Sequence, residues 1–200
     1  MDGLGILIII PGLLQYSPAL GFTVEHDCSN QGIDQMPSWI PAVAVSFICS
    51  GNKISMATAN NFKYLDKLHK IDLGDNEFSE FPNFSPIGTL KTLILSKNKL
   101  TNESFSNFVI PASLDKLDLH QNQITGLPVL CQYKESLTID LRFNPIICDE
   151  NIAWLLTQGF IVMGSCNLPQ HLNGREISSL SYDDLEITEG KWRQSTSGNF

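Results

Sequence analysis

The sequence is poor in basic residues and lacks the short motifs of common enzymes. Lys and Arg number 13 against 21 Asp and Glu, so the formal net charge is −8. Because phosphate-bearing partners are held by basic surfaces, this balance argues against nucleic acid and anionic lipid as partners. The chain contains no CxxC pair, HExxH, GxSxG or phosphate-binding loop. We therefore expect a non-enzymatic protein with no cofactor and no bound metal.

No apolar run has the length of a membrane span. The most apolar one, LGILIIIPGLL, covers only residues 4–14, whereas a bilayer core needs about twenty residues. Together with the small residues Ser17, Ala19 and Gly21 that follow, it is typical of a secretory signal peptide. We predict a signal peptide over residues 1–20 and a secreted, extracellular product; a buried strand or helix is the alternative. The polar tail, residues 189–200, lacks the apolar end of a lipid-anchor signal.

Five asparagines recur at a nearly constant interval. Spacings of 24, 22, 24 and 22 residues separate Asn52, Asn76, Asn98, Asn122 and Asn144. Apolar residues recur eight, five and three positions before the asparagine and two after it; around Asn98 they are Leu90, Leu93, Leu95 and Leu100. The first and last copies are degenerate, as terminal repeats usually are. A sustained period of this length predicts a solenoid.

Each LxL segment predicts a short strand with both leucines pointing inward, and successive strands stack in parallel. The asparagine sits where the chain leaves the strand, and its amide both donates and accepts hydrogen bonds. Stacked asparagines therefore predict a buried structural ladder.

The repeated pattern, LxxLxLxxNxL over residues 42–147, resembles that of the leucine-rich-repeat family. The resemblance implies an α/β-type solenoid, a right-handed horseshoe with a parallel sheet on its concave face and irregular or 3₁₀ segments on its convex face. It also implies a cap at each end, here an abridged N-terminal cap over residues 21–41 and a C-terminal cap over residues 148–188.

The segments between strands have no clean helical period. We predict irregular or 3₁₀ structure for residues 77–89 and 101–113, with phenylalanines filling the core: Phe78, Phe81, Phe84, Phe105 and Phe108. Two acceptor tripeptides for N-glycans, beginning at Asn83 and Asn102, fall in these segments. We predict both asparagines as glycosylation sites on the convex side.

The C-terminal cysteines resemble the cap of Slit-like and Toll-like ectodomains. Cys148, Trp154-Leu155 and Cys166 match that pattern, while Glu150 stands where the second cap cysteine belongs and the fourth is missing. In the family the first cysteine pairs with the third, so the resemblance implies a Cys148–Cys166 disulfide and an oxidising compartment.

Three cysteines remain. Cys28 and Cys49 occupy matching inward positions on successive strands, which is compatible with two buried free thiols or with a disulfide between them. Cys131 is either buried or left for pairing between chains, and the oligomeric state stays open.

The outward strand positions lie two, four and six residues before each asparagine. In the C-terminal half these positions bring acidic and basic residues together, and the residue just before the last asparagine adds an aromatic ring. We predict this group as the partner-binding patch: Lys116, Asp118, His120, Asp140, Arg142 and Phe143. Arginine and aromatic residues are common in protein interfaces. The alternative is a solvated sheet whose Lys–Asp and Asp–Arg pairs satisfy one another.

These features favour binding of an extracellular protein or glycan through the concave face, in adhesion, matrix organisation, growth-factor capture or immune recognition. One alternative is an acidic structural component of an extracellular or mineralised matrix. Another is a soluble decoy form of a leucine-rich-repeat receptor. The acidic pairs Asp149-Glu150 and Asp183-Asp184 lack the alternating ligand spacing of a calcium loop, so we expect solvated surface there.

Overall fold

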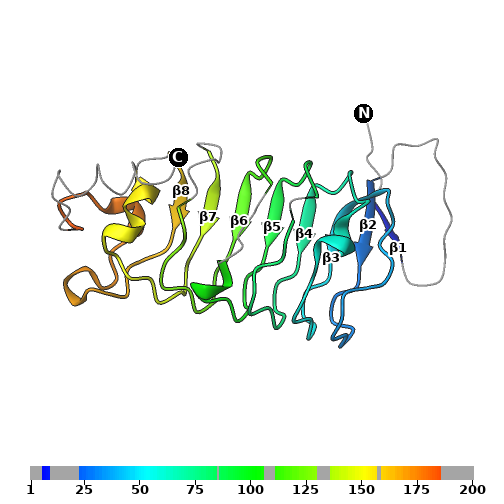
Figure 1. The fold of residues 1–200 in the computed structure, drawn as a ribbon, viewed down its shortest axis with the longest axis horizontal. Coiled ribbons are helices and arrows are strands. Elements are labelled where there is room, and N and C mark those ends of the chain that lie inside the picture. Colours follow the sequence, from blue (N-terminus) through cyan, green and yellow to red (C-terminus); the bar gives the residue numbers. More distant parts are fainter. Residues whose placement is uncertain are drawn as a thin grey trace.

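The computed structural model describes residues 6–9, 23–84, 86–105, 111–129, 136–156 and 159–185. Within these ranges the chain is a parallel-strand solenoid whose strands form one sheet in chain order (Figure 1). The strands are β1 (Ile6–Ile9), β2 (Thr23–Asp27), β3 (Ala44–Ile48), β4 (Lys70–Asp72), β5 (Thr92–Ile94), β6 (Lys116–Asp118), β7 (Thr138–Asp140) and β8 (Ile161–Met163). No helix in the described part of the chain is long and apolar enough to cross a membrane.

Only residues 6–9 of the predicted signal peptide are described. They form β1, which pairs in parallel with β2. This pairing belongs to the uncleaved chain, so removal of residues 1–20 stays a prediction. Cys131, Phe108 and the polar tail lie outside the described residues.

The strand register confirms the predicted alignment of the repeats. Strands β3 to β7 pair so that equivalent positions form straight rows across the sheet. The inward row is fully buried and consists of Phe47, Ile71, Leu93, Leu117 and Ile139. The side chains between these inward positions point to the opposite side, which we call the open face; it is the face that the sequence analysis treated as concave.

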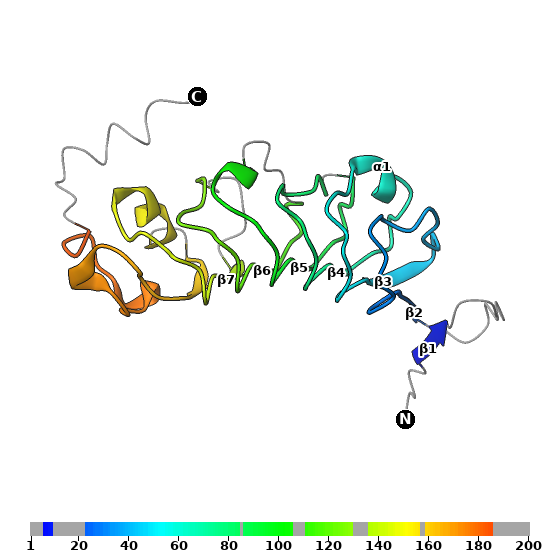
Figure 2. The same ribbon diagram turned by 90° about the horizontal axis from the view of Figure 1, so that it is seen from below.

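The core extends from the inward strand residues into the segments between strands. The described phenylalanines of those segments are buried, as predicted, and Phe81 contacts both Phe84 and Phe105. Ring centroids lie 5.8 Å apart for Phe81 and Phe84 and 5.5 Å apart for Phe81 and Phe105. The short helix α1 (Ala59–Phe62) and the 3₁₀ turn η1 (Glu103–Phe105) lie on the side opposite the strands (Figure 2).

The asparagine ladder is present and buried. Asn98 shows its chemistry: Nδ2 lies 3.0 Å from the carbonyl of Leu73 in the preceding coil and 3.1 Å from those of Leu95 and Ser96 in its own. Its Oδ1 accepts a hydrogen bond from the backbone N–H of Phe78 at 2.9 Å. Each of the other four asparagines likewise joins its own coil to the one before it. The side chain thus replaces water for backbone groups that the turn leaves unpaired.

A left-handed residue precedes each ladder asparagine. The φ angles are 67°, 53°, 53°, 55° and 58° at Gly51, Asp75, Lys97, Gln121 and Phe143. This conformation turns the chain sharply out of the strand. Every residue type except glycine takes it at a steric cost.

Disulfides join coils at both ends of the described solenoid. Cys148 and Cys166 are bonded, with Cα atoms 5.5 Å apart, as the resemblance implies. Of the two alternatives for Cys28 and Cys49, the structure has the disulfide, with Cα atoms 4.6 Å apart. Both members of this pair are buried, which confirms their inward placement.

His26 covers the N-terminal end of the core. Its ring stacks on Phe47 at 5.7 Å between centroids and meets Trp39 edge-on at 6.2 Å. Burial lowers the pKa of His26 below its ordinary value, although the charge of Asp27 acts in the opposite direction. The neutral imidazole is therefore the form that fits this position.

The C-terminal segment adds a strand that the sequence analysis did not foresee. After β7, the 3₁₀ segment η2 (Glu150–Leu156) buries Trp154 and Leu155, and β8 then pairs with β7. Gly164 follows β8 with a φ of 145°, and a Cβ there would lie 3.2 Å from the Leu141 backbone carbon. Two short 3₁₀ turns, η3 (Gln170–Leu172) and η4 (Ile177–Ser179), complete the segment.

Candidate binding site on the open sheet face

The six residues predicted as the partner-binding patch lie on two neighbouring coils. Lys116 and Asp118 belong to β6, and Asp140 belongs to β7, directly opposite Asp118 in the strand register. His120 and Arg142 follow the two strands at equivalent positions, and Phe143 occupies the next turn. We call these six residues the patch. The register places Lys116, Asp118 and Asp140 on one face, and hydrogen bonds bring the side chains of His120 and Arg142 to the two aspartates. The binding role of the six residues stays a prediction.

The aspartates of the patch also hold the backbone at the strand ends. The Oδ1 atom accepts a hydrogen bond from the backbone N–H two residues later, at 3.2 Å for Asp118 and 3.1 Å for Asp140. The same turn occurs at Asp72, at 3.0 Å, and at Asp27, at 2.8 Å. This local bond explains why an acidic residue can occupy a strand end that is largely covered. The repeat pattern alone does not reveal this structural role.

Asp140 and Arg142 form a two-pronged ion pair. The Nε atom of Arg142 lies 3.0 Å from Oδ1 of Asp140, and Nη2 lies 2.6 Å from Oδ2. Burial by itself would raise the pKa of Asp140, but the hydrogen bonds and charge of Arg142 outweigh it, so the pKa is lowered. The pair therefore stays ionised at neutral pH and fixes the orientation of the guanidinium.

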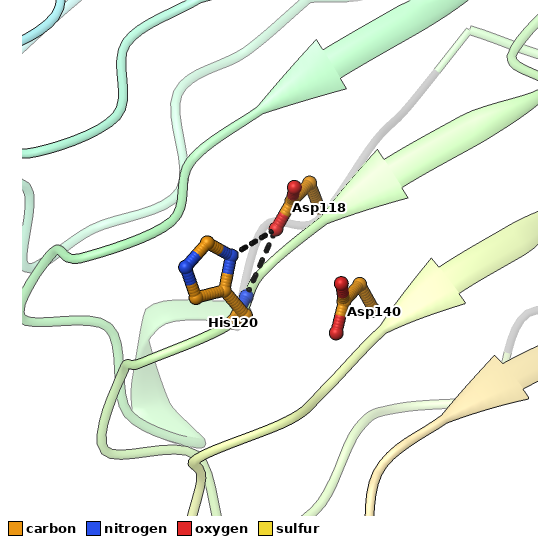
Figure 3. A group of neighbouring side chains, drawn as sticks. All are labelled: Asp118, His120 and Asp140. Atoms are coloured by element: carbon orange, nitrogen blue, oxygen red, sulfur yellow. Dashed lines mark hydrogen bonds and ion pairs between the residues drawn. The ribbon is translucent and has the colours of Figure 1, made fainter.

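Asp118 and His120 form a second pair beside the first. The Nδ1 atom of His120 lies 2.8 Å from Oδ1 of Asp118, and Figure 3 shows the ring turned onto this carboxylate. One ligand atom each of Asp118, His120 and Asp140 lie within 4.8 Å of one another. One imidazole nitrogen and two carboxylate oxygens suit a zinc-type ion. However, Arg142 already occupies both oxygens of Asp140, so a cation would have to displace its guanidinium.

Phe143 is largely exposed to solvent and has a strained backbone conformation. The residue is 79% exposed and adopts the left-handed conformation with a φ of 58°. An L-residue pays about 1–2 kcal/mol for that conformation, and an exposed ring recovers little of it through burial. The equivalent turn positions of the other repeats hold glycine or a polar residue, never an aromatic one. Phe143 is therefore the residue of the patch that the fold explains least.

Strand β8 extends the open face by one strand beyond the prediction. Ile161 is exposed beside Thr138, and Met163 is half-buried beside Asp140. A signal for this strand was present in the sequence, because Asn167 lies 23 residues after Asn144. The inward positions before it hold Gly159 and Gly164 instead of leucine, which hid the repeat.

The acidic residues of the C-terminal segment serve local structure. Asp184 forms an ion pair with Arg175 and accepts hydrogen bonds from the backbone N–H and hydroxyl of Ser181 at 2.8 and 2.7 Å. The bond from Arg175, followed by those from Ser181, lowers the pKa of Asp184. Asp149 accepts hydrogen bonds from Asn151. Neither carboxylate is arranged as an open calcium ligand.

The two predicted glycosylation sites lie in segments away from the open face. Asn83 and Asn102 are both exposed, but Ser85 of the first tripeptide lies outside the described residues. Oδ1 of Asn102 accepts hydrogen bonds from the backbone N–H groups of Thr125 and Gly126 at 2.8 and 3.1 Å. Because the carbonyl oxygen makes these bonds, a sugar on Nδ2 is compatible with them.

No protein-family model matches the chain, and no curated protein is significantly similar to it. Function is therefore inferred from the fold and from the patch.

Proposed function

We propose that this protein is an extracellular leucine-rich-repeat protein that binds a protein or glycan through its open sheet face, without catalysis. The two disulfides support an oxidising compartment such as the cell exterior. The repeat pattern and the asparagine ladder support the finer assignment of the solenoid to the leucine-rich-repeat type. The Cys148–Cys166 bond supports reading the segment after β7 as a C-terminal cap.

One observation carries the proposed site: a buried carboxylate holds an exposed guanidinium in place beside an exposed aromatic ring. Asp140 is only 1% exposed, while the side chain of Arg142 is 55% exposed. A fixed side chain on a rigid sheet loses little entropy when a partner binds. Arginine and aromatic residues are also the types that most often dominate interface energies. Arg142 and Phe143 are accordingly the expected anchors of the interface.

The test begins with the secreted, glycosylated protein as bait in a pulldown, carried out with and without calcium. For the partner recovered, Arg142→Ala and Phe143→Ala should each weaken binding by about 2 kcal/mol or more. Asp72→Asn, on the N-terminal half of the same face, should change affinity much less. Unchanged affinity in both patch variants would exclude this site.

Two further outcomes separate the alternatives. Calcium-dependent association with insoluble material, without a discrete partner, would favour the acidic matrix component. A partner shared with a membrane-bound relative, for which this protein competes, would favour a soluble decoy.

A further inference from the structure

The acidic and basic side chains of the patch differ in exposure. The formal charges of its two carboxylates and its two permanently basic side chains sum to zero. The carboxylates, however, are covered: Asp118 is 8% exposed and Asp140 is 1% exposed. Arg142 is largely exposed and Lys116 is half-buried. The exposed charged atoms that the patch presents to a partner are therefore mainly those of its basic side chains, although the whole chain carries a net charge of −8.

The exposed basic groups also retain hydrogen-bonding capacity. Arg142 donates hydrogen bonds from Nε and Nη2 to Asp140, and within the described residues its Nη1 forms no hydrogen bond. Lys116 forms no ion pair with any described part of the chain. The carboxylates, in contrast, are occupied: Asp140 by Arg142, and Asp118 by His120 and a backbone N–H. The patch thus offers donors outward and keeps its acceptors inward.

We propose that the partner is a protein that presents an acidic, partly apolar segment to this patch. This inference rests on the proposed function and specifies its ligand. Carboxylates of the partner would accept hydrogen bonds from the free side of Arg142 and from Lys116. Lys116 pairs with Thr138 on β7, and Arg142 follows Thr138 by four residues. Four residues of extended backbone span about 13 Å. Carboxylates about four residues apart in an extended peptide match that distance.

The apolar surroundings favour a protein over a sulfated glycan. Phe143 and Ile161 are both exposed, and Met163, at the end of β8, is half-buried. The exposed side chains of Phe143 and Ile161 gain from contact with apolar groups, which a peptide supplies beside its carboxylates. A densely charged polyanion would also meet repulsion from the acidic remainder of the chain. Glu176 adds to this repulsion near the patch, because its negative charge acts on Arg142.

The experiment uses a displayed library of random peptides, about twelve residues long, panned against the full secreted protein with Arg142→Gln as the counter-selection bait. We expect enrichment of Asp and Glu over Asn and Gln, at positions about four apart, together with an apolar residue. Soluble copies of the enriched peptides should bind Arg142→Gln at least tenfold more weakly and Lys116→Gln severalfold more weakly. Glu176→Gln should strengthen binding.

A matched control removes a cation elsewhere. Lys99 is exposed and pairs with Glu77 at 2.9 Å, outside the patch. Lys99→Gln should leave peptide affinity unchanged.

The outcomes distinguish the proposed binding site from the proposed acidic ligand. Peptides that need Arg142 and Phe143 but show no preference for acidic residues would refute the acidic partner and leave the proposed function intact. Peptides that bind independently of the patch, or no enrichment at all, would refute the acidic segment and also count against the site. A heparin oligosaccharide that binds through Arg142 more tightly than the acidic peptides would refute the choice of a protein.

Discussion

Replacing Asn98 tests the physical account of the ladder. Asn98→Ala removes both halves of the amide from a buried position in the middle of the solenoid. The backbone N–H of Phe78 has Oδ1 of Asn98 as its hydrogen-bond acceptor and would lose it. A buried donor without a partner costs about 1–3 kcal/mol.

The carbonyl groups lose less than the donor does. Leu73 O also accepts from Asn76, and Leu95 O also accepts from Asn122, so each keeps one asparagine amide. Losing the Nδ2 bonds therefore adds about 1 kcal/mol, the net value of an ordinary hydrogen bond. We expect Asn98→Ala to lower the free energy of unfolding by about 3 kcal/mol in total.

The near-isosteric change Asn98→Asp separates hydrogen bonding from volume. One carboxylate oxygen can still accept from Phe78, but the other replaces the donor and faces the carbonyls of Leu73 and Leu95. Burial and these carbonyls would raise the pKa of the new carboxyl group. The folded state then holds the proton to higher pH than the unfolded state, so the variant gains stability relative to wild type as pH falls from 7 towards 5.

The assay is urea unfolding of the oxidised protein, followed by circular dichroism at pH 7 and pH 5. Lys99→Ala is the control, because its exposed ion pair is worth only about 0.2–1 kcal/mol. An Asn98→Asp variant as stable as wild type at pH 7, or a difference independent of pH, would refute the ladder account.

Four further predictions follow from the structure. The mature protein should appear in the medium and begin near residue 20 on N-terminal sequencing; an intact Met1 on an intracellular product would contradict this. Peptide mapping without reduction should recover Cys148 linked to Cys166, and replacing both by alanine should cost about 3 kcal/mol of stability. Because the pKa of His26 is lowered on folding, stability should decline as pH falls below about 6.5, and His26→Phe should flatten that decline in urea midpoints measured at pH 7.5 and 5.5. Phe143→Gly should raise the free energy of unfolding by about 1 kcal/mol, because glycine fits the left-handed turn, while it weakens partner binding; a loss of stability would show that the ring packs.

Periodicity made most of the solenoid predictable. Each strand must place its central residue inward and pair with both neighbouring strands, which leaves few possible alignments. Buried leucines such as Leu93 and Leu117 therefore fix the strand register. The phenylalanines followed for the same reason, since large apolar side chains in the intervening segments have only the core to fill. The repeat spacing also predicted that Lys116, Asp118 and Asp140 share one face.

What escaped prediction depends on contacts that the repeat does not encode. Strand β8 lacks inward leucines and is held by backbone pairing with β7. The repeat spacing placed Cys28 and Cys49 on neighbouring strands but did not decide between free thiols and a bond, which depends on the orientation of the two side chains. The pairing of Asp140 with Arg142 was foreseen only as a general possibility, and its burial asymmetry needed coordinates.

The placement of the disulfides bears on how this molecule loses its structure. Each coil of a linear array contacts only its neighbours, so unfolding begins most easily at the two ends, where a coil has a neighbour on one side. Cys28–Cys49 ties the coil of β2 to that of β3, and Cys148–Cys166 spans β8 near the other end. While the bonds are intact, they oppose separation of the coils that they join, so opening of those coils must also involve the interior of the solenoid. Reduction would turn a molecule that unfolds as one unit into one that peels from its ends.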